Sequence, residues 1–275
     1  MILTEHASEE IRQQIHRLCG IHLQRDKDYL LVQRLSPLLA QHECRNWEEL
    51  ANRLRGSAVR CDLHQAVVEA ITTPETSFFR DGHPFEAIRQ QILPPHLASG
   101  HGMRIWSVAC STGQEPYSIA MLLRELRATT EGLPRISADR ITATDISQRC
   151  LSIAQAGIYT PHEVQRGLSE IRLHRHFRPV GTNWQIRDEM RQMVQFSMLN
   201  LIESWPDFVG FDLILCRNVL IYFDLPTRTQ ILRRLCQLLP IGGWLILGAA
   251  ENLLQISLPL EPVRVGLTTL YRRSG

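Results

Sequence analysis

The chain has 275 residues, of which 44% are hydrophobic and 21% charged, a composition typical of globular proteins. Its net charge of +2 is too small to indicate a nucleic-acid partner. No apolar run approaches the roughly 20 residues that a membrane-spanning helix needs, and the acidic start MILTEHASEEIRQQ lacks the order of a secretion signal. We therefore expect a cytoplasmic protein without direct membrane insertion.

Seven cysteines are scattered along the chain, and no C-x-x-C pair occurs among them. An odd and dispersed set indicates neither a disulfide framework nor a zinc site. His174 and His176 lie in the basic run RLHRHFR without partners at ligand spacing, so we expect them on a solvated face. The sequence predicts no metal site.

The beginning of the chain shows only helical patterns. Ile11, Ile15 and Leu18 fall at helical spacing, and Gly20 follows as a stop signal. We predict an N-terminal all-helical domain over residues 1–72.

Residues 73–103 are predicted to form a linker and a helix. Pro74 disfavours helical geometry in the residue before it, and the surrounding Thr/Pro cluster marks a junction. A helix is expected from about 84 to 93, ended by Pro94 and Pro95.

From residue 104 to 275, short apolar strands alternate with helices. The expected strands are RIWSVAC, ITATDI, FDLILCRN and GGWLILGAA, with the helices PYSIAMLLREL, SQRCLSIAQAG and TRTQILRRLCQLL between them. This alternation predicts an α/β domain with a mostly parallel sheet. Residues from about 157 to 199 interrupt it, and NWQIRDEMRQMVQFSMLN suggests short antiparallel strands. We predict a small inserted β subdomain there.

Ligands of such sheets bind beyond the carboxyl ends of the strands. The loop CSTGQE after the first strand has one glycine, Gly113, so it is neither a dinucleotide-binding motif nor a phosphate loop. Asp145 ends the second strand, where a carboxylate can accept both hydroxyls of a ribose. The alternative is that Asp145 caps the next helix. A ribose site without a pyrophosphate site favours S-adenosylmethionine.

Four segments carry more specific information: TTPETSFFRD, RIWSVACSTGQEPYSIAMLL, ATDIS and CRNVLIYFD. Together, in this order, they resemble the CheR family of chemoreceptor glutamate O-methyltransferases. GIYT, FSMLNL and GGWLILGAAENL extend the resemblance over nearly the whole chain. It implies a class I, Rossmann-like methyltransferase sheet. It also implies methyl transfer from S-adenosylmethionine to glutamates in the cytoplasmic signalling domain of a chemoreceptor, with S-adenosylhomocysteine as product.

The resemblance further implies roles for particular residues. Thr76 and Arg80 match positions that hold the methionine end of the cofactor, where they would share one face of a helical turn. Glu115 matches a glutamate near the cofactor's amino end, although a structural role at a helix start stays open. Asp145 matches the ribose-binding acid.

Five further positions match residues of the family's site. Asn200 and Leu201 match the pair beside the adenine, and Arg217 and Asn218 match a polar pair after the third strand. Tyr222 matches a tyrosine lining the reaction centre, with core packing as the alternative. We predict that Arg217 and Tyr222 are catalytic.

The proposed chemistry needs no general base, because a glutamate side chain is already ionised near neutral pH. Two other functions stay open. One is a methyltransferase of another substrate class, and the other is a non-enzymatic module that senses the cofactor.

Three departures from the family pattern affect the predicted cofactor and receptor contacts. Pro74 stands where the family often has Asn. The helix expected to face the receptor, YLLVQRLSPLLAQHE, carries Arg34 but few other basic residues. The loop between Phe177 and Gln185 is short, so we expect the receptor to bind without a tether through its C-terminal tail peptide.

Overall fold

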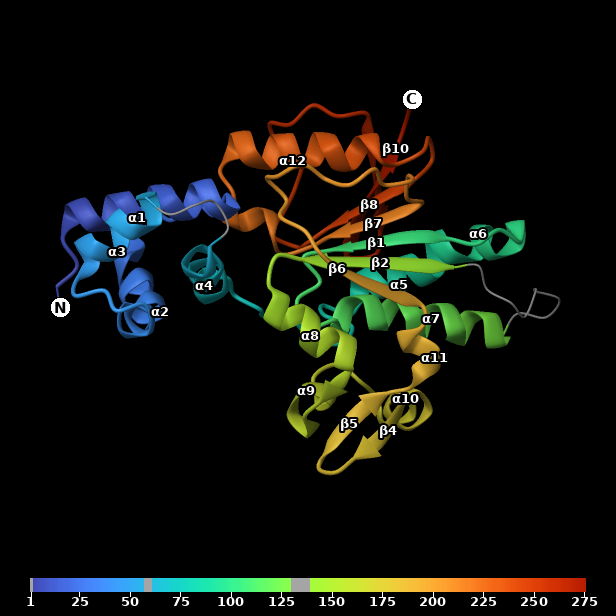
Figure 1. Cartoon of the computed structure of the whole chain (residues 1–275). Helices are drawn as coiled ribbons and strands as arrows, with labels where there is room; N and C mark the ends of the chain where they lie inside the picture. Colours follow the sequence, from blue (N-terminus) through green and yellow to red (C-terminus); the bar gives the residue numbers. More distant parts are fainter. Residues whose placement is uncertain (1, 57–60, 130–138) are drawn as a thin grey trace. The chain divides into compact units, whose positions relative to one another are not determined.

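The computed structural model describes residues 2–56, 61–129 and 139–275. They divide into two compact units (Figure 1). The first unit contains Met1–Thr73, Asn200–Ser204 and Ile221–Ile231. The second contains Pro74–Leu199, Trp205–Leu220 and Leu232–Gly275.

Among the described residues of Met1–Thr73, the regular elements are helices. They are α1 (Glu5–Cys19), η1 (Arg25–Lys27), α2 (Asp28–Gln41), α3 (Trp47–Gly56) and α4 (Asp62–Ile71). Ile11 and Ile15 of α1 are fully buried. Gly20 ends α1 in the left-handed conformation with φ 74°, and its N–H donates to the carbonyl of His16. The predicted all-helical domain is confirmed.

The second unit is built on a seven-stranded sheet in the order β6-β2-β1-β7-β8-β10-β9. The strands are β1 (Arg104–Val108), β2 (Arg140–Asp145), β6 (Val194–Met198), β7 (Leu213–Cys216), β8 (Trp244–Leu247), β9 (Leu260–Val265) and β10 (Thr268–Arg273). The first five in this order run parallel, and β10 is antiparallel to both its neighbours. This confirms the predicted Rossmann-like methyltransferase sheet.

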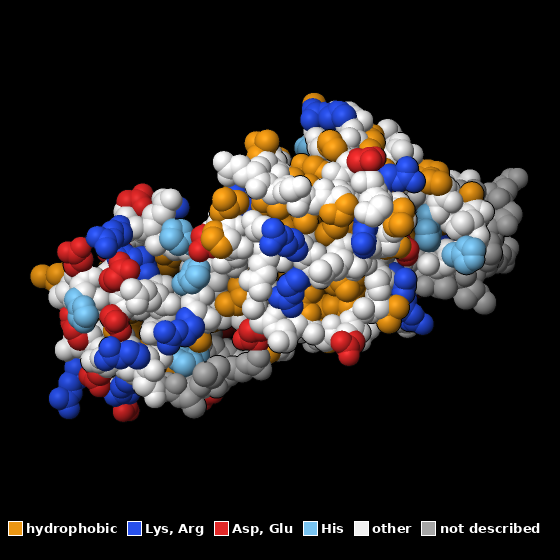
Figure 2. Space-filling view, turned by 90° about the horizontal axis from the view of Figure 1, so that it is seen from above, with side chains coloured by type: hydrophobic (Ala, Val, Ile, Leu, Met, Phe, Trp, Pro, Cys, Tyr) orange, Lys and Arg blue, Asp and Glu red, His pale blue; other side chains and the backbone are white. Residues whose placement is uncertain are grey.

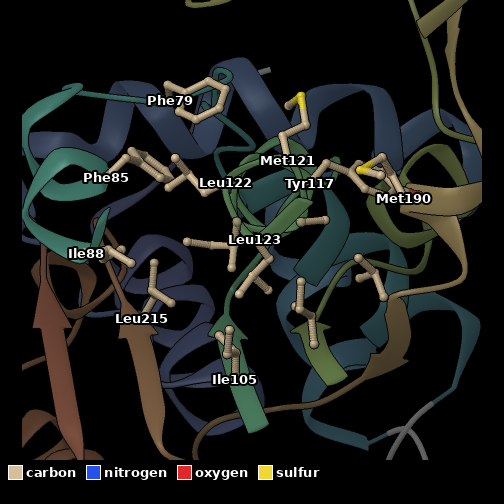
Figure 3. Packing of buried hydrophobic residues seen from close by; sticks show 14 of the residues in the cluster. Phe79, Phe85, Ile88, Ile105, Tyr117, Met121, Leu122, Leu123, Met190 and Leu215 are labelled. Atoms are coloured by element: carbon tan, nitrogen blue, oxygen red, sulfur yellow. The ribbon is translucent and has the colours of Figure 1, made fainter. Parts of the chain in front are cut away.

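Three helical segments precede the first strand: α5 (His83–Ala87), η2 (Ile88–Ile92) and α6 (Leu93–Ser99). The helices that lie between parallel strands of the large sheet include α7 (Gln114–Thr129), α8 (Gln148–Ala156), η3 (Leu220–Tyr222) and α12 (Leu225–Gln237). The helix α7 packs against β2 and β6, and α5 packs against β10. Figure 3 shows Leu122 and Leu123 of α7 lying over Ile105 of β1 and Leu215 of β7. Burial of this apolar surface is the main force that holds helix and sheet together.

The inserted subdomain is antiparallel, as predicted, and its sheet has three strands. Its order is β3-β5-β4. The elements are β3 (Ile158–Tyr159), α9 (Pro161–Gln165), α10 (Glu170–His176), β4 (Phe177–Val180), β5 (Asn183–Ile186) and α11 (Asp188–Arg191). The segment 194–198, which we expected within this subdomain, is instead the parallel edge strand β6 of the large sheet.

The helix expected to stop at two prolines continues beyond them to Ser99. Ile88–Ile92 forms one π-helical stretch, and α6 begins directly after it. Pro94 and Pro95 lie in the first turn of α6, where a helix needs no backbone N–H donors. The expectation was wrong because these prolines begin a helical segment instead of ending one.

His176 is also placed differently from the expectation. His174 is exposed, but His176 is buried with 4% exposure, and its Nε2 lies 3.2 Å from Oε1 of Glu125. Arg172 donates two hydrogen bonds to the same carboxylate, at 2.9 and 2.8 Å. Burial alone would raise the pKa of Glu125, but the bonds from His176 and Arg172 hold it at about 2. These contacts between Arg172 and His176 of α10 and Glu125 of α7 hold the two helices together.

The described residues contain no group of His, Cys, Asp or Glu side chains arranged to hold a metal ion. Over the same residues, no helix combines the length and apolar character needed to cross a membrane.

Candidate active site

Unusual backbone conformations concentrate where the parallel strands end. Seven non-glycine residues of the described chain have positive φ, and five of them lie in three segments of the second unit. Ala109 and Ser111 follow β1, Asn218 follows β7, and Phe79 and Asp81 lie in the segment before α5. The left-handed conformation raises the energy of each such residue by roughly 1–2 kcal/mol. Backbone strain of this kind clusters at functional sites, so these three segments are candidates for the active site.

A buried arginine that follows β7 bonds to the start of α7 and to the segment before α5. The side chain of Arg217 is only 1% exposed. Its Nη1 donates to Oε2 of Glu115 at 2.9 Å, and its Nη2 donates to Oδ2 of Asp81 at 2.8 Å. Nη2 also donates to the carbonyl of Arg80 at 2.9 Å. Arg217 therefore links the end of β7, the start of α7 and the segment before α5. We call Arg217, Glu115 and Asp81 the arginine cluster.

Glu115 is nearly as buried, with 12% of its side chain exposed. Its Oε1 accepts a hydrogen bond from the hydroxyl of Ser107 at 2.8 Å. Burial raises the pKa of Glu115, although the charge of Arg217 and the hydroxyl of Ser107 counteract it. A cationic group bound nearby would stabilise the ionised form. The carboxylate thus suits a ligand ammonium as well as Arg217.

Arg80 lies next to Asp81 in the segment before α5, but its side chain bonds to a backbone carbonyl, whereas that of Arg217 bonds to Glu115 and Asp81. The Nη1 of Arg80 donates to the carbonyl of Glu75 at 2.7 Å, so the guanidinium turns back over its own chain. Thr76, four residues earlier in the chain, is half-buried. The prediction that Thr76 and Arg80 share one face of a helical turn is wrong. The backbone between them is not helical, because Phe79 adopts a left-handed conformation with φ 48°.

Asp145 ties two loops together at the end of β2. Its Oδ2 accepts from the N–H of Ser111 at 2.7 Å, and its Oδ1 accepts from the N–H of Ser147 at 2.9 Å. The N-cap of α8 is Ser147, whose hydroxyl accepts from the N–H of Cys150 at 3.0 Å. The alternative that Asp145 caps this helix is therefore wrong.

Asn200, Leu201 and Tyr222 belong to the first unit. The amide of Asn200 donates to the carbonyl of Leu18 at 2.7 Å, and Leu201 is buried with 7% exposure. The carbonyl of Tyr222 accepts from the N–H of His22 at 2.8 Å. The end of α1 and the residues after it thus hold both chain segments within this unit.

Sequence reasoning missed Asp81 and Ser107, which bond to Arg217 and Glu115. It also missed Glu251, which accepts hydrogen bonds from the backbone N–H groups of the loop after β7. Asp81 directly follows Arg80 in the motif TSFFRD, and that adjacency was the available signal. Ser107 lies within an apolar strand, where a buried hydroxyl predicts a nearby hydrogen-bond partner. Glu251 follows a run of small residues after β8 and gave no signal of its own.

Two family descriptions match the chain. "CheR methyltransferase, SAM binding domain" covers residues 74–265, and "CheR methyltransferase, all-alpha domain" covers residues 7–72. The chain belongs to the CheR methyltransferase family. As a CheR protein it is a methyltransferase that uses S-adenosylmethionine.

Curated relatives of this CheR protein match over nearly their full length. A "Chemotaxis protein methyltransferase Cher2" from Pseudomonas putida is 39% identical, covering 89% of this chain and 90% of its own. A "Chemotaxis protein methyltransferase 1" from Pseudomonas aeruginosa is 39% identical, covering 94% of both chains. Among solved structures, the N-methyltransferase NodS from Bradyrhizobium japonicum, with bound S-adenosyl-L-homocysteine, is 16% identical with a TM-score of 0.40. That match covers 71% of this chain and 90% of NodS.

The residues at the strand ends fit S-adenosylmethionine. Ala109, Ser111 and Gly113 all have positive φ, so the loop after β1 turns sharply at the carboxyl end of the strand. A carboxylate, Asp145, adjoins the loop at the position suited to ribose. Glu115 suits the cofactor's ammonium group.

Proposed function

We propose that this CheR protein methylates glutamate side chains in the cytoplasmic signalling domain of a chemoreceptor. The products are glutamate methyl esters and S-adenosylhomocysteine. The observation that carries the proposal is the arginine cluster, in which two carboxylates hold the guanidinium of Arg217 at the carboxyl edge of the sheet. The names of the relatives support a chemotaxis substrate.

The cofactor contacts are assigned as follows. Arg80 and Thr76 bind the methionine carboxylate, since arginine suits this anion, and Glu115 binds the ammonium group. Asp145 accepts hydrogen bonds from the ribose hydroxyls, and Asn218 lies beside the methionine end. Asn200 and Leu201 bind the adenine, the amide pairing with the base edge and the apolar side chain covering it.

The reaction depends mainly on positioning. Bound S-adenosylmethionine supplies an electrophilic methyl group, and the ionised receptor glutamate is already a nucleophile. Arg217 is held by three hydrogen bonds, so it can orient charged groups without reorganising. Tyr222 orients the incoming carboxylate with its hydroxyl. Alignment of the reacting atoms can supply several kcal/mol of the barrier.

The first prediction concerns the kind of methyl product. Incubating the protein with methyl-labelled cofactor and a receptor signalling domain should place label on the receptor, and mild alkali should release it as methanol. Carboxyl esters hydrolyse under these conditions, whereas methylated nitrogen does not. Alkali-stable label, or label only on nucleic acid or small molecules, would contradict the proposal. Absence of transfer to any acceptor despite tight cofactor binding would favour a sensing module.

We further propose that the receptor binds without a tail-peptide tether. The hairpin of β4 and β5 pairs Val180 with Asn183, which leaves a turn of two residues. This short turn supplies few side chains to enclose a peptide. Pro179 in the edge strand β4 has no N–H to donate to an added strand.

Electrostatic docking has little support in the first unit. Arg34 donates to the carbonyls of Ile71 and Thr72 at 2.6 and 3.2 Å, so it caps α4. On the face seen in Figure 2, acidic and basic side chains are interspersed over the helical part of this unit. Binding through this unit should therefore depend weakly on salt.

The second prediction follows from these two features. A complete receptor signalling domain, and the same domain without its last residues, should be methylated at comparable rates at low and at physiological ionic strength. A domain with its receptor glutamates intact but an unrelated tail of equal length serves as the matched control. A large drop in rate on truncation, or tight binding of the isolated tail peptide, would contradict the proposal.

A further inference from the structure

A single buried carboxylate organises the loop that follows β7. Glu251 lies after β8 and is 8% exposed. Its Oε2 accepts from the N–H groups of Asn218 at 2.8 Å and Gly248 at 2.7 Å. Its Oε1 accepts from the N–H groups of Val219 at 2.9 Å and Leu220 at 2.7 Å. Four backbone donors therefore converge on one side chain.

Three of these donors are consecutive, and that fixes the shape of the loop. Asn218 has φ 59°, a conformation that costs a non-glycine residue energy and needs outside support. The bonds from Asn218, Val219 and Leu220 supply that support, because each N–H group would lose its hydrogen bond to the buried carboxylate if the loop relaxed. Arg217 immediately precedes this turn.

Gly248 allows the approach from the other side. A Cβ atom at this position would lie 2.7 Å from Oε2 of Glu251 and 2.8 Å from the backbone nitrogen of Asn218. Any larger residue would therefore push the carboxylate and the turn apart. Glu251 and Gly248 together act as a clamp on residues 217–220, which we call the Glu251 clamp.

We propose that Glu251 is a positioning residue for methyl transfer, which sets the place of Arg217 and Asn218 through the Glu251 clamp. The proposal rests on the cofactor role assigned above to this pair. The hydrogen bonds that Glu251 accepts from the turn come from the backbone N–H groups of Asn218, Val219 and Leu220. Its influence passes through the backbone of the turn.

The chemistry of the clamp requires a carboxylate. Glutamine keeps the size of the side chain but replaces one acceptor oxygen by an NH2 group. That group would face two backbone N–H donors, so two of the four bonds would be lost and replaced by repulsion. Aspartate keeps both acceptors, but it is one methylene shorter and can restore only part of the geometry.

The third prediction tests this positioning role. Glu251→Gln should weaken S-adenosylhomocysteine binding about tenfold or more and lower kcat in the folded protein, and Glu251→Asp should recover part of both. Affinity is measured by calorimetry, with stoichiometry reporting the folded fraction, and kinetics separate kcat from KM. Gly248→Ala disturbs the same clamp without changing the charge, and it should act in the same direction. It decides the question if Glu251→Gln does not fold.

Asp139→Asn is the matched control. Asp139 is a buried carboxylate that accepts from the N–H of Met103 at 2.8 Å, at the opposite end of β2 from the site. It should lower the melting temperature and leave affinity and kcat per folded molecule unchanged. The same pattern in Glu251→Gln and Gly248→Ala would overturn the positioning role. Unchanged affinity and turnover in Asn218→Ala would instead overturn the proposed function of the pair.

Discussion

Replacing Arg217 with methionine is expected to lower the free energy of unfolding by about 3–5 kcal/mol, the usual cost of breaking a buried ion pair. The guanidinium is 1% exposed and bonds to two carboxylates, Glu115 and Asp81. Methionine has a similar length and fills much of the space, so the loss reports charge and hydrogen bonds. We also expect turnover of the folded variant to fall at least about 100-fold, because a preorganised charge is removed.

Two further variants separate stability from catalysis. The double variant Arg217→Met/Glu115→Gln removes the two buried charges and leaves Asp81, whose side chain is 35% exposed, to be solvated. It should regain much of the stability but none of the turnover. Arg127→Met breaks a comparable buried pair, in which the guanidinium donates to Oδ2 of Asp139 at 3.0 and 2.7 Å. It should lose stability and keep its turnover. Denaturant unfolding and steady-state kinetics make the comparison, and normal turnover in folded Arg217→Met would reject a catalytic role.

The strands at the centre of the sheet could be predicted because buried strands are rich in apolar residues. Four of the five residues of β1 and all four of β7 are buried, and both strands consist mostly of apolar residues. The strand β6 was not recognised as part of this sheet, because only Val194 of its five residues is buried. An edge strand of this kind has no apolar pattern that distinguishes it from a small antiparallel strand.

The positions of the candidate site residues were predicted less evenly. A single acid at the end of a predicted strand indicated Asp145 directly, since topology fixes where that strand ends. The arginine cluster joins residues 81, 115 and 217, and no local pattern encodes such a contact. The Glu251 clamp could not be predicted from the sequence for a similar reason. Its four partners are backbone N–H groups, which every non-proline residue carries, so the sequence holds no mark of the pairing.

Asp145→Ala is expected to weaken binding of both S-adenosylmethionine and S-adenosylhomocysteine by roughly 1.5–3 kcal/mol, the usual worth of hydrogen bonds to a charged group. The structure adds a complication, because the carboxylate also accepts from the N–H groups of Ser111 and Ser147. The variant could therefore lose affinity through a ribose contact or through a loosened loop. Total affinity alone does not distinguish these two causes.

An analogue of S-adenosylhomocysteine without the 2′ and 3′ hydroxyls distinguishes them. If Asp145 accepts these hydroxyls, the unmodified protein should bind the analogue much more weakly than S-adenosylhomocysteine, and Asp145→Ala should bind both about equally. If Asp145 only holds the loop, the variant should keep the full preference for the hydroxylated ligand. Ser147→Ala is the matched control, since it removes the cap of α8 and should lower stability by roughly 1 kcal/mol. It should leave the preference unchanged, because the ribose interaction would belong to Asp145 alone of these two neighbouring side chains.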